Sequence, residues 1–165
     1  MNYWLMKSEP TTYSIDTLKT EGETLWDGVR NYQARNFLKQ MQIGDRAFFY
    51  HSNTAIPGIV GLAEIVANQV IDPSQFDPQS DYYDPKSSPD APRWQTVKIA
   101  FIQKFPMIIT LNELKARFSP EELGVVKKGN RLSVLPVPTA IAEQILSLVS
   151  LAVPENETWN WDKSS

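Results

Sequence analysis

The sequence contains no cysteine among its 165 residues, and its only histidine is His51. Disulfide bonds, thiolate metal sites and a cysteine nucleophile are therefore excluded, and the absence suits a reducing compartment. A zinc site would lack nitrogen and sulfur ligands. A Ser-His-Asp triad would have to use His51, yet no G-x-S-x-G pattern is present. A hydrogen-bonded core histidine is the simpler interpretation of His51, and no catalytic set is recognisable.

Glycine is also scarce, with seven residues, and no phosphate-loop or dinucleotide pattern occurs. No stretch approaches the roughly 20 apolar residues of a transmembrane helix, and the first ten residues lack the pattern of a signal peptide. We therefore expect a protein of the cytoplasm, or of the nucleus in a eukaryote, that does not associate with membranes. The formal net charge of −3 argues against a non-specific nucleic-acid coat, but it permits a local basic face that reads one nucleotide.

An acidic, proline-rich loop is expected over residues 72–93. Asp77, Asp81 and Asp84 could in principle hold a hard cation there, but they lack the calcium-loop pattern, so a solvated loop is the better interpretation. We expect no metal ion and no cofactor. Loops of this length are usually functional or disordered, and the sequence leaves both an ordered loop and a mobile flap open.

The remaining sequence predicts one globular α+β domain. Hydrophobic residues make up 42% of the chain, including five Trp, six Tyr and seven Phe, enough for one buried core. Hydrophobic patterns predict strands over residues 3–9, 46–52, 57–71, 94–102 and 131–135, and helices over 14–19, 34–41, 110–118 and from 138 onward. This order favours a small mixed β-barrel flanked by helices.

Residues 26–41 are the most distinctive stretch. The second part predicts an amphipathic helix whose buried stripe contains Ala34, Phe37, Leu38 and Met41. Trp26, Gly28 and Arg30 precede this helix, where a cation is unfavourable unless an anion lies nearby. Each residue alone has an ordinary explanation: a core indole, a turn glycine and an arginine paired with a surface acid. As a group they favour a binding site.

Aromatic residues also lie beside hydrogen-bonding side chains elsewhere in the sequence. The pairs are Trp26 with Arg30 and Asn31, Tyr50 with Ser52, Trp94 with Arg93, and, without an aromatic, Arg131 with Ser133. Unstacked nucleobases are recognised by aromatic stacking and by hydrogen bonds to their edges. These pairs therefore favour a nucleotide-binding protein, although many of the aromatic residues are expected in the core.

Several segments, taken in order, resemble the EVE domain (thymocyte nuclear protein-like) family of the PUA-like superfamily. They are residues 3–10, 26–36, 44–52, 57–61, 83–86, 94 and 131–134. The resemblance implies a PUA-like barrel over residues 1–153, with residues 154–165, including Trp159 and Trp161, as a tail. It also implies a monomeric, non-catalytic module whose partner is DNA or RNA carrying a modified base.

The resemblance further implies the residues of a base pocket. They are Lys7, Ser8, Glu9, Trp26, Gly28, Arg30, Asn31, Tyr50, His51, Ser52, Pro57, Gly58, Ile59, Trp94, Arg131 and Ser133. As hypotheses, Trp26 and Trp94 stack the base and Asn31 and Ser8 read its edge. Arg30, Arg35 or Arg131 would contact phosphate.

Two alternatives stay open. The first is an enzyme acting on a nucleotide or a related small molecule, with Glu9 or His51 as general base; a second titratable group beside either would favour it. The other is a protein-interaction scaffold, which the polar character of the distinctive residues disfavours. Because the net charge is negative, we expect binding to depend only weakly on salt.

Overall fold

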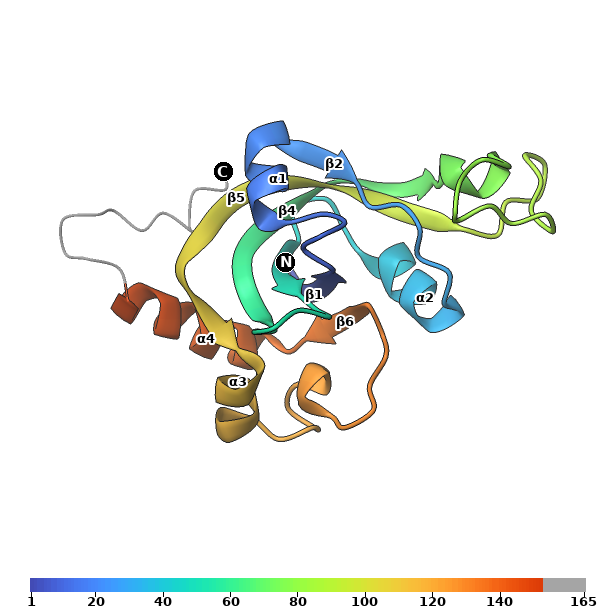
Figure 1. The fold of residues 1–165 in the computed structure, drawn as a ribbon. Coiled ribbons are helices and arrows are strands. Elements are labelled where there is room, and N and C mark those ends of the chain that lie inside the picture. Colours follow the sequence, from blue (N-terminus) through green and yellow to red (C-terminus); the bar gives the residue numbers. More distant parts are fainter. Residues whose placement is uncertain (153–165) are drawn as a thin grey trace.

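A computed structural model describes residues 1–152, and within them a single six-stranded sheet forms the framework. Its strands are β1 (Tyr3–Ser8), β2 (Glu23–Leu25), β3 (Arg46–His51), β4 (Gly58–Ile71), β5 (Gln95–Thr110) and β6 (Val134–Val137). The spatial order is β2-β5-β4-β3-β1-β6, and only β1 and β3 pair in parallel. The long strands β4 and β5 curve strongly (Figure 1). The predicted α+β class with a barrel-like sheet is confirmed, but across the described residues the edge strands β2 and β6 do not pair, so the barrel is open.

Four α-helices and two short 3-10 helices flank the sheet in the described part of the chain. They are α1 (Ile15–Glu21), α2 (Tyr32–Gln40), α3 (Leu111–Arg117), α4 (Thr139–Ala152), η1 (Pro73–Phe76) and η2 (Gly124–Val126). Ser14 caps α1 by accepting the Thr17 amide, and Thr110 caps α3 by accepting the Glu113 amide. Both caps agree with the preference of hydroxyl side chains for this position.

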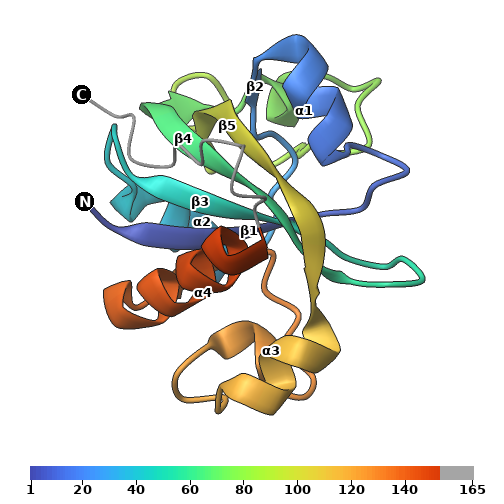
Figure 2. The ribbon, with the colours of Figure 1, turned by 90° about the vertical axis from the view of Figure 1, so that its left-hand side faces the viewer.

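The alternation of side chains along β1 divides the interior into two cores. Tyr3 and Leu5 join a cluster packed against α3 and α4, whereas Trp4 and Met6 join a cluster packed against α1 and α2. Figure 2 shows α3 and α4 together on one side of the sheet and α1 on the other. Both faces of β1 are covered and both of its edges are paired, so β1 is a central strand of the sheet.

The structure corrects several predicted boundaries. β5 continues to Thr110 instead of ending at 102, and β2, only three residues long, was not predicted. The last strand begins at Val134, since residues 131–133 belong to a turn in which the Leu132 amide donates to Asn130. The tail with Trp159 and Trp161 lies outside the described residues, and the domain boundary at 153 stays a prediction.

The sheet is irregular at Gly61, where the pairing of β4 with β5 shifts between Ile59 and Gly61. A Cβ atom at Gly61 would lie 2.6 Å from the Gln103 carbonyl oxygen and 2.7 Å from the Ile15 side chain. Close packing of α1 on the sheet therefore accounts for this glycine.

Candidate functional site

A cavity of about 540 Å³ lies beyond the carboxyl end of β1, within the size range of small-molecule sites. It is lined by Lys7, Ser8, Glu9, Thr12, Tyr13, Thr24, Leu25, Trp26, Asp27, Gly28, Val29, Arg30, Tyr82 and Ser133. The structure thus brings together the predicted residues Lys7, Ser8, Glu9, Trp26, Gly28, Arg30 and Ser133. The segment after β2 supplies one wall of this cavity, and Tyr82 joins it from the long loop between β4 and β5.

A buried carboxylate, Asp72, connects these two segments. One of its oxygens lies 2.9 Å from the Gly28 amide nitrogen and 3.0 Å from Nη1 of Arg30, while the Ser74 amide donates to the other at 2.8 Å. The side chain of Asp72 is only 2% exposed. Burial raises the pKa of Asp72, but hydrogen bonds from Ser74, Gly28 and Arg30 outweigh it, so the pKa lies below its ordinary value.

The Arg30 guanidinium is held by several hydrogen bonds to other groups of the protein. Besides Asp72, its guanidinium donates to the Tyr82 carbonyl oxygen at 2.7 and 2.9 Å and to the Ser74 hydroxyl at 3.0 Å. The anion expected beside this cation is therefore part of the chain, and it is buried rather than at the surface. The structure gives Arg30 the task of holding the cavity wall, which leaves its predicted contact with phosphate without support.

Gly28 allows Tyr82 to approach this wall. Its φ of +83° lies in the region that favours glycine, and a Cβ atom there would lie 2.6 Å from the Tyr82 ring. The glycine therefore serves both a turn and a close contact.

Trp26 has a fixed position in the cavity wall. Its indole is 8% exposed and packs edge-on against Phe49, with ring centroids 5.6 Å apart. Its amide donates to the Val97 carbonyl oxygen at 2.9 Å. The ordinary interpretation, a core indole, is confirmed, and the stacking role of Trp26 stays a prediction.

Two carboxylates also line the cavity. Glu9 accepts a hydrogen bond from Asn53 at 3.2 Å, whereas Asp27 has no hydrogen bond to another side chain of the described residues. Burial and then the nearby charge of Asp72 raise the pKa of Asp27. Asp27 was not among the predicted site residues, although it belongs to the distinctive stretch.

Lys7 and Ser8 make internal contacts at the end of β1. The Lys7 ammonium lies 5.9 Å from the centroid of the Tyr50 ring, its neighbour across the β1–β3 pair, and burial lowers the pKa of Lys7. The Ser8 hydroxyl donates to the Tyr13 carbonyl oxygen at 2.6 Å, which leaves its lone pairs to accept.

His51 lies outside the cavity and has a structural partner. Its Nε2 accepts the Ile15 amide at 3.1 Å, at the start of α1, so this nitrogen is unprotonated. Burial lowers the pKa of His51. The hydrogen bond expected of this histidine is present, although His51 is only partly buried. Its charged neighbours, Asp16 and Lys104, form an ion pair with each other at 2.7 Å.

The other predicted site residues do not line this cavity. They are Asn31, Tyr50, Ser52, Pro57, Gly58, Ile59, Trp94 and Arg131. Asn31 caps α2 by accepting the Ala34 amide at 3.0 Å, and Tyr50 and Ile59 belong to the core. Arg131 is exposed and makes no ion pair within residues 1–152.

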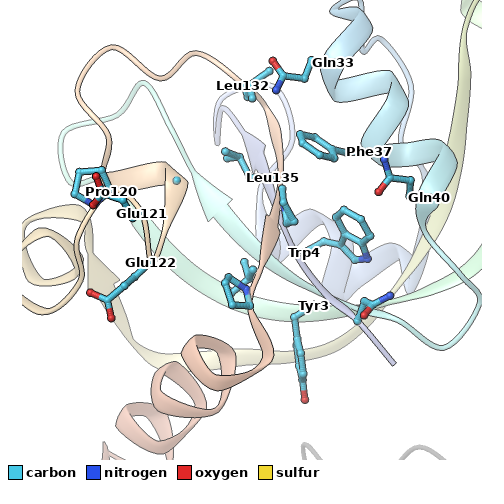
Figure 3. Close-up of a pocket in the computed structure, with 15 residues that line it drawn as sticks. Tyr3, Trp4, Gln33, Phe37, Gln40, Pro120, Glu121, Glu122, Leu132 and Leu135 are labelled. Carbon is cyan, nitrogen blue, oxygen red and sulfur yellow. The ribbon is translucent and has the colours of Figure 1, made fainter.

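A second cavity of about 600 Å³ lies between α2, β6 and residues 120–124. Figure 3 shows Trp4 and Phe37 on its floor and Glu121 and Glu122 on the opposite side. It contains none of the predicted site residues, so the functional site is identified by its chemistry and not by its volume.

Residues 1–152 contain no group of three or more His, Asp or Glu side chains arranged to hold a metal ion. Asp84, considered above as a cation ligand, instead accepts from Trp94 Nε1 at 2.7 Å and pairs with Arg93. No helix in the same range has the length and apolar character needed to cross a membrane.

Comparison with known proteins identifies the family. The EVE domain matches residues 2–148. Mouse thymocyte nuclear protein 1 is 43% identical in an alignment of 165 positions. The alignment covers 89% of this chain and 73% of the relative. Protein PSPTO5229 from Pseudomonas syringae superposes with a TM-score of 0.86 at 46% identity, covering 89% of this chain and 99% of that one.

A further solved relative is the human THYN1 protein in complex with DNA containing 5-methylcytosine. It is 39% identical, has a TM-score of 0.82, and is covered over its whole length by 96% of this chain. The match extends over nearly all of the described fold, including the sheet and both sides of the cavity. The chain therefore belongs to the EVE domain family, with its PUA-like fold.

Proposed function

We propose that this protein is a non-catalytic reader of a modified nucleobase and that the Trp26 cavity holds the base. The observation that carries the proposal is the wall itself, which contains both an indole held against Phe49, that of Trp26, and the carboxylate residue Asp27. The human relative solved with 5-methylcytosine DNA supports the choice of ligand class. The structural engagement of His51 weakens the alternative of an enzyme that uses it as general base.

We assign a role in binding to four residues. The base stacks on the exposed part of Trp26, a contact worth about 1–3 kcal/mol. Asp27 accepts a hydrogen bond from the donor edge of the base, as carboxylates do from the cytosine amino group. Ser8 accepts a second, and the exposed Arg131, two residues before Ser133 of the cavity lining, contacts phosphate.

DNA carrying 5-methylcytosine is the first ligand to test, and RNA is the second. The monomeric state and a location in the cytoplasm or nucleus stay predictions. Weak dependence on salt also stays a prediction, and it requires that the cavity supply most of the affinity.

The test is equilibrium binding to short DNA and RNA oligonucleotides that carry one methylated, one hydroxymethylated or no modified base. Each mixture is also analysed by mass spectrometry for conversion of the base. We expect selective binding without conversion. Conversion would establish an enzyme instead, and binding without selectivity would remove the base-reading proposal.

Two variants test whether the cavity binds the modified base. Trp26→Ala should abolish selectivity, but loss of a large core side chain can cost about 3–5 kcal/mol, so folding must be checked. Asp27→Asn removes the charge of a residue that makes no hydrogen bond to another side chain of residues 1–152, so it should reduce selectivity while preserving the fold. Asp90→Asn, an exposed loop acid outside the cavity, is the matched control and should bind as the wild type does.

A further inference from the structure

Tyr32, the first residue of α2, forms an exposed aromatic surface on a rigid support. Tyr32 is 46% exposed, and its ring stacks on Trp94 with centroids 5.0 Å apart and planes 18° from parallel. Trp94 itself is 5% exposed, and its indole nitrogen donates to Asp84 at 2.7 Å. Tyr32 therefore covers a face of Trp94, and Trp94 in turn fixes the orientation of the exposed Tyr32 ring.

Two guanidinium groups flank this stack. Arg35 lies 4.7 Å and Arg93 5.5 Å from the Tyr32 centroid, and they lie 5.9 and 6.0 Å from the Trp94 centroid. The outer face of Tyr32 is the face turned away from Trp94. A guanidinium on that face would lie much farther from the Trp94 centroid than the 5.0 Å that separates the two ring centroids. Since both are only slightly more distant, Arg35 and Arg93 lie beside the two rings, and neither of them covers the outer face of Tyr32.

The two arginines differ in whether they form an ion pair with a carboxylate. Arg93 pairs with Asp84 at 3.2 Å. Arg35 donates to the Arg93 carbonyl oxygen at 2.9 Å and to Asn36, but it pairs with no carboxylate in residues 1–152. An open aromatic face beside an uncompensated guanidinium is the combination with which proteins bind single-stranded nucleic acid, by base stacking and phosphate contact.

This surface adjoins the Trp26 cavity. Arg30 lines the cavity, and its guanidinium lies 5.2 Å from the Trp94 centroid and 5.8 Å from the Tyr82 centroid. The same side chain therefore borders both places.

We propose that Tyr32, Arg35 and Arg93, supported by Trp94, form a second nucleotide subsite. It stacks the unmodified base adjacent to the modified nucleotide and holds a phosphate of the same strand on Arg35. The subsite rests on the proposed function, because it needs the cavity to place the strand. It reads no base identity, since every base has a face that can stack.

The experiment separates the two sites by using a modified and an unmodified oligonucleotide of the same sequence. Tyr32→Leu should weaken binding of both by the same factor, about 5- to 100-fold, because one stacking contact is lost. Their affinity ratio, which reports the cavity, should not change. Tyr32→Phe keeps the ring and should bind as the wild type does.

Arg35→Gln tests the phosphate contact. The slope of log affinity against log salt should become shallower by about 0.7–0.9, the value for one phosphate. Lys39→Gln removes a charge of the same sign from the next turn of α2 and should leave the slope unchanged. A fluorescent 2-aminopurine next to the modified base should be quenched by the wild-type protein and by Tyr32→Phe, but not by Tyr32→Leu.

The outcomes distinguish the two proposals. Unchanged affinity and quenching in Tyr32→Leu, with selectivity intact, would overturn the subsite and leave the reader standing. A wild-type protein that does not discriminate the modified from the unmodified strand would overturn the reader, and with it the subsite as a neighbour of a modified base. A loss of slope in Lys39→Gln equal to that in Arg35→Gln would overturn the specific phosphate contact.

Discussion

Two buried aspartates hold the opposite ends of α2, and they differ in their partners. After the helix, Asp45 accepts from the Asn2 amide, the Trp4 indole nitrogen and the Gln42 amide at 2.9–3.0 Å. All three donors are neutral and belong to the framework.

Before the helix, Asp72 also accepts amide hydrogen bonds, but it adds the cation Arg30 and joins two segments that line the cavity. Asp45, which accepts only from neutral donors, stabilises the chain between α2 and β3. A carboxylate that also neutralises a cation beside a cavity shapes the site. Replacement of Asp72 should therefore affect both binding and stability, whereas replacement of Asp45 should affect stability alone.

Replacing Asp72 should have the largest effect. Asp72→Ala leaves Arg30 without its carboxylate and the Gly28 amide without its acceptor, which should lower the free energy of unfolding by about 3–5 kcal/mol. Selectivity for the modified base should also fall in the fraction that remains folded. Chemical denaturation and oligonucleotide binding measure the two effects, and wild-type selectivity in a folded variant would contradict the role of Asp72 in the site.

Asp45→Ala should be nearly as destabilising but should not affect binding. The buried Trp4 indole nitrogen loses its acceptor at a cost of about 1–3 kcal/mol. The partly buried amides of Asn2 and Gln42 add less, because water can reach them. Measured below its unfolding temperature, the variant should bind the oligonucleotides as the wild type does. A loss of selectivity equal to that of Asp72→Ala would remove the distinction between the two acids.

Gly28→Ala should have a smaller effect, confined to the Asp72 side of α2. The positive φ costs about 1–2 kcal/mol for an alanine, and the new methyl group displaces the Tyr82 ring. We expect a matching loss of stability and weaker base selectivity. Gly44→Ala, which has a φ of +95° and open space around it, is the control for backbone strain, and it should keep full selectivity.

Acid should produce the smallest effect. Because the pKa of Asp72 in the folded state lies below its ordinary value of 3.8, the unfolded chain takes up the proton first as the pH falls. The stabilisation is therefore complete above about pH 4 and is lost as the pH falls through the folded pKa. The difference in unfolding free energy between the wild type and Asp72→Asn should shrink in this range; a constant difference would contradict the assignment.

The sequence predicted what depends on local pattern. The strand alternation of Tyr3 to Met6, the stripe of α2 and the caps at Ser14 and Thr110 follow from neighbours a few residues apart. These features position the cavity, and the resemblance to the EVE domain supplied part of its lining.

What the sequence could not predict depends on contacts between distant segments. The positive charge of Arg30 indicated a nearby anion, but its partner Asp72 lies 42 residues away and Tyr82 lies 52 residues away. Trp94 was assigned a stacking role because its type suits one, yet Tyr32 covers it. One local signal was available, since Asp72, Pro73 and Ser74 form a helix start in which Asp72 is the cap.

The hydrogen bond from the Gly28 amide to Asp72 joins residues 44 positions apart, which has a consequence for the order of assembly during folding. The contact closes a long loop and becomes favourable only after β4 and β5 have formed the sheet to which the loop is attached. The cavity wall should therefore form late and reopen without global unfolding. Hydrogen exchange of the Gly28 amide should be faster than that of the β1 amides, and a bound oligonucleotide should slow it selectively.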